Sequence, residues 1–456
     1  MASSRLLCAE DPGVKGSPSR LPLPTSAQQA WQDAELGLVF HYDLHLFDGV
    51  RYHQHQNRQT HFRDVNVFNP AKLDTDQWVE AAKLCGARFA IITASHETGF
   101  RLWQSDVNPY CLKATRWGNG KRDIVGEFVR SCRKAGIEPG VYLGARWNGQ
   151  LGIWDFKVTG RSPMTQEQYN RLIESEVEEI CTRYGDLFEL WFDGGILAPA
   201  NGGPDVLPIF EKHQPRCLFY HSDQRRDARW GGTESGTVGY PCWATIDLAR
   251  IRTGRKWGPD LRELLRHGDP DGKDWCPAMS DAPLRNHEWF WEPGDEGKIY
   301  SLKALVNMYS KSVGRNSTLI LGATPDSRGL MPEADMNRLR EFGKEIQRRF
   351  ARPMAETKAS GDVVELALPR PQKIDHVSIM EDIARGERVR EYEFEGLVGS
   401  QWRRLCQGLC VGHRRIQAFR ETEVTRARLR ITRSVATPII RSLAVFHVDD
   451  VRVSSN

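Results

Sequence analysis

Short apolar runs alternate with longer amphipathic stretches over the first 350 residues of the chain. The apolar runs fall at 36–42, 89–93, 140–143, 187–192, 217–221 and 318–321. Three of the stretches between them, 74–85, 123–135 and 166–184, repeat apolar residues every three or four positions, which predicts helices. Strands that alternate with helices predict an α/β fold with a parallel sheet, and this length favours a (β/α)8-like barrel of the TIM type.

Residues 225–293 interrupt this alternation. They are rich in Gly, Pro and Asp and hold six of the 14 tryptophans of the chain. Loops of such length inside an otherwise regular domain usually carry function. We therefore expect long functional loops in this part of the barrel domain.

The pattern of apolar and polar residues changes again after residue 350. The segments VVELALP, HVSIM, YEFEGLV, RARLRIT and SLAVFHV are short and β-rich, with turn residues at 361–362 and 384–387. This pattern predicts a C-terminal β-sandwich. The chain then divides into a Pro- and Ser-rich, mostly disordered lead-in at 1–27, a catalytic barrel at 28–350 and a β-sandwich at 351–456.

Composition and charge exclude some classes of protein. Hydrophobic residues make up 40% and charged residues 27%, as in ordinary globular proteins. A net charge of +4 against 63 basic and 59 acidic residues gives no reason to expect nucleic acid, and no apolar run is long enough to span a membrane. The N-terminus lacks the apolar core of a signal peptide, so a cytoplasmic location is the default expectation. The sequence gives no oligomeric state.

Cysteines and histidines give little sign of a metal. The ten cysteines form no CxxC pair, which predicts buried free thiols. Histidines 41, 45, 53, 55 and 61 cluster, and His53-x-His55 is the most suggestive pair for a metal. Without a neighbouring Cys or a helical i,i+4 pair, contact with sugar or solvent is favoured, and we expect neither a metal nor a cofactor. The basic pairs 225–226 and 414–415 are predicted to be solvated.

Polar residues follow five of the predicted strands. They are His41, residues 95–97, residues 146–147, Asp193 and residues 221–223. Alone, an Asp before two glycines is typical of a turn. Five such positions favour a rim of polar groups around one pocket, because barrel enzymes carry their catalytic side chains at the carboxyl ends of strands. Two carboxylates there could cleave a glycosidic bond, and a retaining pair lies roughly 5–5.5 Å apart. The tryptophans could stack on sugar faces or fill the core.

At the level of longer motifs, the chain resembles the retaining α-L-fucosidases of glycoside hydrolase family 29, particularly the branch shared by plants and many bacteria. The resemblance runs from about residue 28 to residue 448. It is carried by QQAWQDAELGLVFHYDLHLF, TASHETGFRLWQS, GKRDIV…CRKAGIEPGVYL, LWFDGG, SDQRRDARWGGTESG, DWCPAMSDAPLRNHEWFW, SVGRNSTLILGATPDSRGLMPEAD and WRRLCQGLCVGHRRIQAF.

This resemblance implies a function and site residues. The family's W-F-D-G motif places the nucleophile on Asp193. Its G-N-E-x-G motif reads GTESG at 232–236, which places the acid/base on Glu234, with Thr233 where the family has Asn; the plainer alternative for Glu234 is a solvated loop carboxylate. The family's first-strand histidine, a sugar contact, falls on His41. The implied activity is exo-hydrolysis of terminal α-L-fucosyl residues from oligosaccharides or glycoconjugates by double displacement.

Two departures bear on the sugar. The family's K-H-H-D-G-F reads SHETGF here, so His96 is kept and Glu97 replaces the second histidine. The family's P-A-E reads Pro-Ala-Met and ends on Met279. An ionised carboxylate only accepts hydrogen bonds, whereas a neutral imidazole both donates and accepts. These changes keep open a glycosidase for a related sugar such as α-L-galactose, or a carbohydrate-binding protein with lost activity. The further substrate-binding candidates are Trp147, Trp191 and Trp230.

Overall fold

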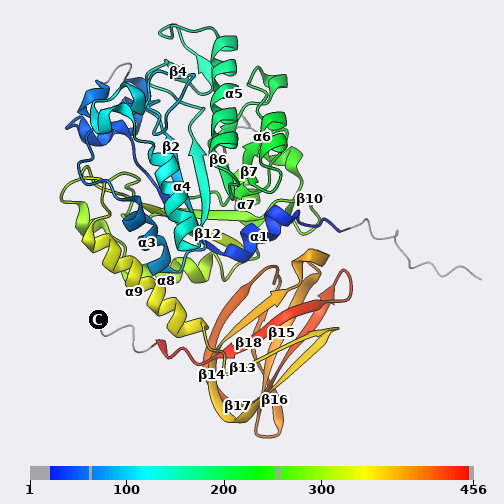
Figure 1. The fold of residues 1–456 in the computed structure, drawn as a ribbon. Helices are drawn as coiled ribbons and strands as arrows, with labels where there is room; N and C mark the ends of the chain where they lie inside the picture. The colour runs from blue at the N-terminus through cyan, green and yellow to red at the C-terminus, as the bar shows by residue number, and fades with distance from the viewer. Residues whose placement is uncertain (1–20, 61–63, 253–256, 451–456) are drawn as a thin grey trace, which may run out of the picture.

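The structure, a computed structural model, describes residues 21–60, 64–252 and 257–450. Its first part is a barrel of eight parallel strands with helices around it, as predicted (Figure 1). In sheet order the strands are β7 Leu218–Ser222, β6 Glu189–Ile196, β3 Glu138–Leu143, β2 Phe89–Ser95, β1 Leu36–Phe40, β12 Ser317–Ala323, β11 Ala278–Pro283 and β8 Arg229–Trp230.

The barrel is nearly closed between its edge strands β7 and β8. The link between them is short, and Asp227 fills the place of a strand pairing. Its carboxylate accepts a hydrogen bond from the backbone N–H of Phe219 at 2.8 Å, and its own N–H donates to the Phe219 carbonyl at 3.2 Å. The side chain and the backbone of Asp227 thus satisfy two backbone groups of Phe219 that the eighth, closing strand pairing would otherwise satisfy.

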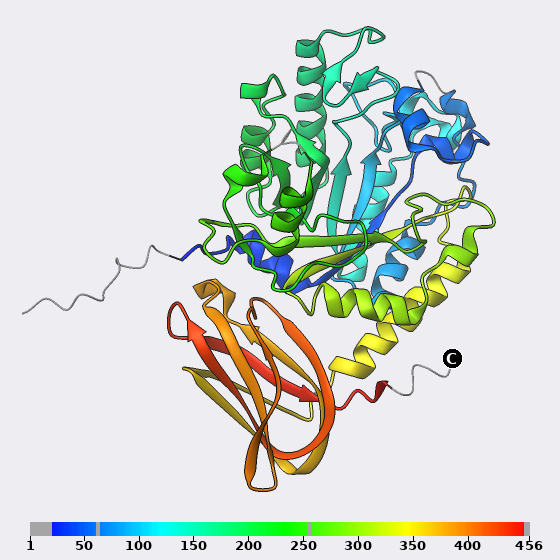
Figure 2. The ribbon, with the colours of Figure 1, turned by 180° about the vertical axis from the view of Figure 1, so that it is seen from behind.

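The helices occupy the outside of the barrel (Figures 1 and 2). They are α1 Ser26–Ala34, α2 Gln54–Gln59, α3 Thr75–Cys85, α4 Ile124–Ala135, α5 Gln166–Arg183, α6 Leu207–His213, α7 Pro259–His267, α8 Leu302–Lys311 and α9 Glu333–Phe350. The three predicted helices are therefore confirmed as α3, α4 and α5. Asp74 and Asp123 cap α3 and α4 by accepting from the backbone N–H three residues on, which satisfies an orphan donor of the first turn.

Shorter elements connect these parts. Two antiparallel pairs are β4 Ile153–Trp154 with β5 Lys157–Val158, and β9 Thr245–Ile246 with β10 Asp274–Trp275. The 3-10 turns are η1 Leu44–Phe47, η2 Val65–Val67, η3 Leu112–Ala114, η4 Trp117–Gly120, η5 Pro199–Asn201, η6 Leu248–Ile251, η7 Asp295–Lys298 and η8 Ile383–Arg385.

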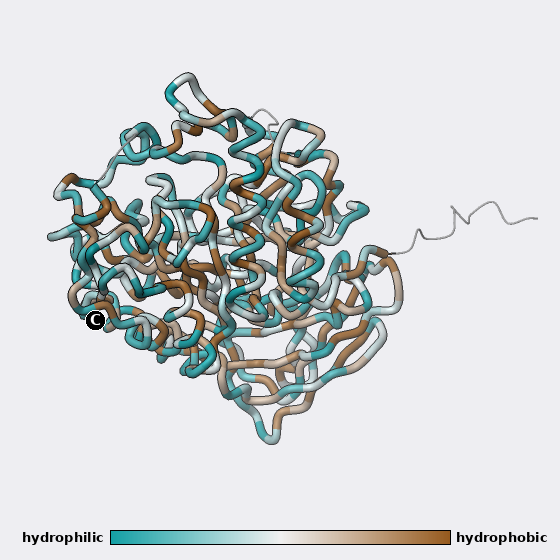
Figure 3. The backbone as a smooth tube through the Cα atoms, turned by 45° about the horizontal axis from the view of Figure 1, so that its top comes forward, coloured by the Kyte–Doolittle hydropathy of each residue, from teal (hydrophilic) through white to brown (hydrophobic). Residues whose placement is uncertain are grey.

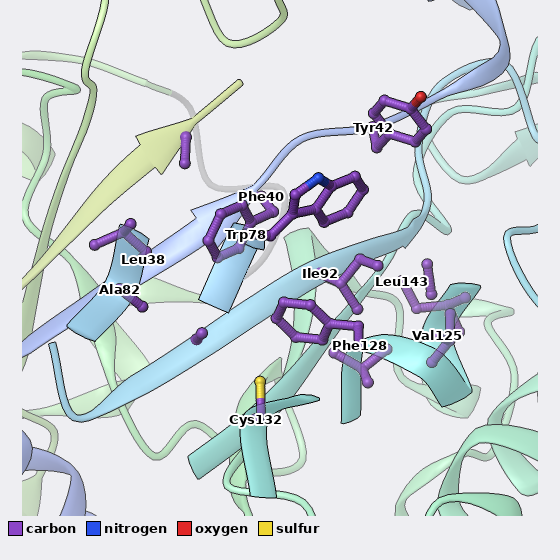
Figure 4. Packing of buried hydrophobic residues seen from close by; sticks show 14 of the residues in the cluster. Leu38, Phe40, Tyr42, Trp78, Ala82, Ile92, Val125, Phe128, Cys132 and Leu143 are labelled. Carbon is purple, nitrogen blue, oxygen red and sulfur yellow. The ribbon is translucent and has the colours of Figure 1, made fainter. Parts of the chain in front are cut away.

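Alternation along the barrel strands separates two cores. Outward-facing residues such as Leu38 and Phe40 pack against the helices, where Phe40 stacks on Trp78 and meets the edge of Phe128 (Figure 4). Inward-facing residues form a separate cluster inside the barrel: Val39, Ile91, Tyr142, Trp191, Tyr220, Met279 and Ile320, closed below by Trp31 of α1. The hydrophobic stretches of the chain accordingly run through the interior in Figure 3.

The expectation of long loops over 225–293 is partly wrong, because this stretch contains two barrel strands. β8 consists of only two residues, and β11 reads AMSDAP. A two-residue strand shows no periodicity, and β11 carries Asp and Pro, two residues that are depleted in strands. Both strands exist because the barrel supplies their partners: β11 pairs with β12 over six residues and with β8 over two.

The C-terminal part is an all-β domain, as predicted. Its six antiparallel strands are hydrogen-bonded in the order β13 Ala355–Ser360, β18 Ile439–Phe446, β14 Val363–Glu381, β17 Arg415–Ser434, β15 Val389–Val398 and β16 Gln401–Gly408. Two predicted strands, VVELALP and HVSIM, merge into β14, which breaks its pairing with β17 twice. The strands curve around a common apolar core (Figure 2).

The C-terminal domain packs against the amino ends of the barrel strands. Both oxygens of buried Glu387 accept from the backbone N–H of Ala244 at 3.0 Å, and the Asn316 side chain just before β12 donates to Glu387 as well. Arg414 pairs with Glu35, just before β1, at 2.7 Å. The opposite end of the barrel, where the strands carry their carboxyl ends, is therefore not covered by this domain.

Three further expectations can be compared with the structure. The prediction that residues 414–415 are solvated is wrong: Arg414 forms the ion pair with Glu35, and Arg415 stacks over the ring of Tyr240 at 4.0 Å. The nine described cysteines are free, and all but the half-buried Cys406 are buried, as predicted; Cys8 lies outside the described residues. Helix α1 already begins at Ser26, inside the expected lead-in, whose residues 1–20 also lie outside the described part.

A fully buried ion pair ties the loop after β2 to helix α5. The guanidinium of Arg101 donates to both oxygens of Glu176, at 2.8 and 2.7 Å, and neither side chain is exposed. The Asn108 amide donates to the same carboxylate at 2.8 Å. Because the pair is desolvated, removing one partner leaves a buried charge without its counter-ion.

We expect Glu176→Ala to lower the free energy of unfolding by about 3–5 kcal/mol, since it leaves the Arg101 guanidinium buried without a counter-charge. Guanidinium chloride unfolding followed by Trp fluorescence measures this. The matched control is Glu167→Ala in the same helix, whose carboxylate pairs with Arg171 in solvent at 77% exposure and should change little. Equal effects of the two variants would contradict the account.

Candidate active site

The alternation of β6 places Asp193 above the interior of the barrel. Glu189, Trp191 and Asp193 share one face of the strand, because side chains alternate with period two. Glu189 lies at the buried end, where it accepts from Trp31 Nε1 at 2.8 Å and burial raises its pKa to about 8. Trp191 belongs to the interior cluster above it. Asp193 is therefore a strand residue that opens into the barrel mouth, and the turn alternative is wrong.

The two glycines after Asp193 allow close approach of other side chains. Gly194 and Gly195 have φ of +66° and +86°, which L side chains rarely adopt. A Cβ at Gly194 would lie 2.8 Å from Arg146 Cδ, and one at Gly195 would lie 2.9 Å from His221 Nε2. The glycines thus let Arg146 and His221 pack beside the segment that follows Asp193, and Arg146, Trp147, Asp193 and His221 line one cavity, which confirms three of the five predicted rim positions.

Asp193 is half-buried, and its charge state is set by opposing influences. Burial raises the pKa of its carboxyl. The hydroxyl of Tyr142, which donates to Asp193 Oδ2 at 3.1 Å, and the positive charges of Arg58 and Arg146 act in the opposite direction. A hydrogen-bond donor and nearby cations favour the ionised form that a nucleophile requires.

Asp193 and Glu234 line the same cavity, which has a volume of about 640 Å³. The candidates Trp147, Trp191, Trp230 and Met279 line it too. Its outer wall is largely apolar and comes from the region of η6 and α7, with Ile251, Trp257, Leu261 and Leu265. The sequence candidates for nucleophile, acid/base and four of the sugar contacts are thus brought together.

Glu234 lies on a loop that is pinned to β11 at both ends. The N–H of Gly231 donates to the Met279 carbonyl at 2.7 Å, and the N–H of Gly236 donates to the Asp281 carbonyl at 2.8 Å. The Glu234 carboxylate is exposed and accepts from Trp289 Nε1 at 3.1 Å. It therefore has access to water at the mouth of the cavity, while Asp193 lies deeper.

His41 and His96 are buried beside the cavity. The His96 ring stacks on Tyr142 with 5.4 Å between ring centres, and the His41 ring lies 4.9 Å from that of Trp289. Burial lowers the pKa of His41 to about 3 and that of His96 well below its usual value, so both are neutral near pH 7. Within the described part of the chain, the Nδ1 atoms of His96 and His221 and the Nε1 of Trp191 are buried without a hydrogen-bond partner.

Glu97 does not line the cavity; both of its oxygens are engaged within the protein. Arg58 Nε donates to Oε1 at 2.6 Å and the Tyr52 hydroxyl donates to Oε2 at 3.0 Å. Burial raises its pKa to about 7 against the opposing influence of Arg58. The Arg58 guanidinium lies 3.5 Å from the ring centre of Trp147, a lining residue. Glu97 therefore holds Arg58 against the wall of the cavity.

Several site residues escaped the sequence analysis. Arg226, predicted to be solvated, lines the cavity with a side chain only 9% exposed. Asp281 lines it with a carboxyl that is buried. Asp281 lies two residues after Met279, so both side chains face the interior of the barrel. This signal could be used only if β11 had been identified as a strand. The hydroxyl of Tyr142 could not be found from sequence, since Tyr is also an ordinary core residue.

The histidine cluster shows no metal geometry. Among the described residues, no group of three or more His, Cys, Asp or Glu side chains could hold a metal ion. His55 contacts Gln59 at 2.8 Å and the ring of Trp154, and His61 lies outside the described residues.

In the same described ranges, the helices are too short or too polar to cross a membrane.

Comparison with known proteins identifies the family. The model of the family described as Alpha-L-fucosidase matches residues 22–349. Alpha-L-fucosidase 1 of Arabidopsis thaliana is 29% identical over 93% of this chain and 88% of its own. The crystal structure of a Bacteroides thetaiotaomicron VPI-5482 protein assigned as an alpha-L-fucosidase is 51% identical, with a TM-score of 0.91 over 94% of this chain and 99% of that one.

A more distant structure shares the fold. It is a Ruminococcus gnavus glycoside hydrolase family 29 fucosidase in complex with fucose, with a TM-score of 0.77 at 23% identity over 95% of this chain and 97% of that one. The barrel, the two carboxylates in one cavity and the match of the family model over most of the chain agree. The chain therefore belongs to the alpha-L-fucosidases, glycoside hydrolase family 29, and is a glycoside hydrolase.

Proposed function

We propose that the chain is a retaining exo-α-L-fucosidase that releases terminal α-L-fucosyl residues from oligosaccharides or glycoconjugates. Asp193 is the nucleophile and Glu234 the general acid/base. The observation that carries this proposal is the pair of carboxylates that line one cavity in different environments, one held within β6 and one exposed on a loop. Such a difference suits two carboxylates for two roles.

The reaction proceeds in two displacements. Ionised Asp193 attacks the anomeric carbon while protonated Glu234 gives its proton to the glycosidic oxygen, so that the bond from carbon to the leaving oxygen breaks and a glycosyl ester forms. Glu234, now a carboxylate, takes a proton from water, which attacks the same carbon and releases Asp193. Two inversions leave the configuration of the sugar unchanged.

The surroundings of the two carboxylates fit these roles. The Tyr142 hydroxyl holds Asp193 Oδ2, and Trp289 Nε1 holds Glu234 Oε2. Strand pairing on both sides of β6 holds the backbone up to Trp191, two residues before Asp193, and the Tyr142 hydroxyl holds the carboxylate itself, so little reorganisation is needed at the moment of attack. The exposed position of Glu234 gives it the water that the second displacement consumes.

The lining of the cavity suits a deoxy sugar. Trp191 and His221 line the cavity, His96 packs on Tyr142 beside it, and each has a buried nitrogen without a hydrogen-bond partner among the described residues, which a sugar hydroxyl would supply. Met279 and the Trp191 ring are apolar and suit a methyl group. Glu97, the residue that raised the alternative of α-L-galactose, is occupied by Arg58 and Tyr52 and offers no unused oxygen to a C6 hydroxyl.

We expect 4-nitrophenyl α-L-fucoside to be hydrolysed with kcat/KM roughly 100-fold above that of 4-nitrophenyl α-L-galactoside, since the extra hydroxyl would meet apolar atoms. Proton NMR of the first-formed sugar should show the α-anomer. A preference for the galactoside would favour the second sugar, a first-formed β-anomer would overturn the retaining mechanism, and the absence of turnover would favour a carbohydrate-binding protein.

We expect Tyr142→Phe to move the acidic limb of the pH profile of kcat/KM to higher pH. Asp193 must be ionised to attack, and burial already raises its pKa, so activity falls as the pH drops through that pKa. Loss of the Tyr142 hydroxyl removes a donor that lowers this pKa, and the limb therefore moves upward.

Tyr184→Phe is the matched control for this variant. It removes a hydroxyl that donates to a different carboxylate, Asp123 Oδ2, at 3.0 Å beneath the cap of α4. This variant should leave the limb unmoved. An unchanged or lowered limb in Tyr142→Phe would contradict the assignment of the limb to Asp193.

A further inference from the structure

The cavity contains a buried carboxyl group, that of Asp281, to which the proposed mechanism gives no task. Asp281 lies on the inward face of β11, two residues after Met279, and is 5% exposed. It lines the same cavity as Asp193 and Glu234. Asp193, Glu234 and Asp281 repel one another when all are ionised, because they share one partly desolvated space, so the charge state of Asp281 requires an explanation.

One oxygen of Asp281 has a fixed partner. Trp230 Nε1 donates to Oδ1 at 2.8 Å, and Trp230 is held beside β11 because β8 pairs with it in register. An indole N–H can only donate, so Oδ1 acts as an acceptor. Any proton on this carboxyl is therefore carried by Oδ2.

The backbone brings Glu234 close to Asp281. The loop that carries Glu234 is pinned to the carbonyls of Met279 and Asp281 itself. Burial, the charge of Glu234 and the charge of Asp193 all raise the pKa of Asp281 well above its usual value, against the opposing influence of the Trp230 N–H.

Basic groups also line this cavity, and two of them pair with other carboxylates. Arg146 Nε lies 2.7 Å from Asp155 Oδ1, and Arg226 lies 3.7 Å from Asp223. Tyr220, a residue of β7 that also lines the cavity, is neutral because burial raises the pKa of its hydroxyl. The charges that act on the pKa of Asp281 are therefore those of Glu234 and Asp193, the two carboxylates of the reaction.

We propose that Asp281 acts on the substrate as a neutral carboxylic acid, which accepts from Trp230 through Oδ1 and donates a hydrogen bond from Oδ2 to an oxygen of the bound glycoside. The inference rests on the proposed function of the cavity. No covalent bond changes at Asp281, and its proton stays in place throughout. A neutral acid supplies a donor where an ionised carboxylate supplies only acceptors, and it leaves Asp193 as the anion beside the anomeric carbon.

The test compares Asp281→Asn with Asp281→Ala. Asn has nearly the shape of a protonated Asp, with an oxygen to accept from Trp230 and an amide N–H to donate into the cavity. We expect Asp281→Asn to keep kcat/KM for 4-nitrophenyl α-L-fucoside within about threefold of wild type and to leave both limbs of the pH profile in place. Asp281→Ala should lower kcat/KM roughly tenfold or more, because a substrate oxygen loses its partner.

Two kinetic results would overturn the proposal. In the first, Asp281→Asn lowers kcat/KM as much as Asp281→Ala does, and the basic limb of its pH profile moves to lower pH. This result would show that a negative charge at residue 281 supports the acid/base. The other is wild-type activity in Asp281→Ala, which would show that the substrate makes no use of this group.

Infrared difference spectroscopy tests the protonation state without turnover. The spectrum of the wild type minus that of Asp281→Asn at pH 7 should contain the carbonyl stretch of a protonated carboxyl, and carboxylate bands alone would overturn the proposal. If the wild type hydrolyses no α-L-fucoside, the proposed function fails, and the infrared result still shows whether Asp281 is a neutral acid.

Discussion

The register of strand β6 inside the barrel is the constraint on which the site depends. Glu189, Trp191 and Asp193 point inward in single file, from the Trp31 contact at the closed end to the cavity at the open end. A slip of one residue would turn Leu190 and Phe192 inward and carry the carboxylate to the helix side. Pairing with β3 and β7 and the buried Glu189–Trp31 hydrogen bond oppose such a slip. The position of Asp193, the proposed nucleophile, thus follows from packing well below it.

The same barrel gives chemically identical groups different surroundings. Asp193 is deep and held by a tyrosine hydroxyl, Glu234 is exposed on a loop, and Asp281 is buried in the wall of the same cavity. The C-terminal domain contacts the opposite end of the barrel, and none of its residues up to 450, where the described part ends, lines the cavity. Its contacts through Glu387 and Arg414 instead brace the ends of β1 and β12 where these strands begin.

Much of the fold could be predicted from the sequence, because long amphipathic helices with capping residues and buried apolar strands carry strong local signals. Helices α3 and α4, each opened by an Asp and closed by a Gly, are the clearest cases. Strands β8 and β11 could not be predicted, since they exist only through pairing with neighbours distant in the chain. For the same reason Asp281 and Arg226 were missed, while Asp193 and Glu234, carried by local motifs, fell in the cavity. Glu97 was found, but its occupation by Arg58 and Tyr52 depends on a tertiary contact that no local pattern shows.

The central claim, that Asp193 forms the covalent intermediate, is tested most directly by trapping that intermediate. The reagent is 2-deoxy-2-fluoro-α-L-fucosyl fluoride. Its fluorine at C2 destabilises the electron-poor transition state and slows both displacements, so the glycosyl-enzyme accumulates. Intact-protein mass spectrometry should then show one added fluorofucosyl group per chain, and peptide sequencing should locate it on Asp193. A label on Glu234, on Asp281 or on another residue would contradict the account. Turnover of the reagent with no inactivation of the enzyme and no adduct would contradict it too.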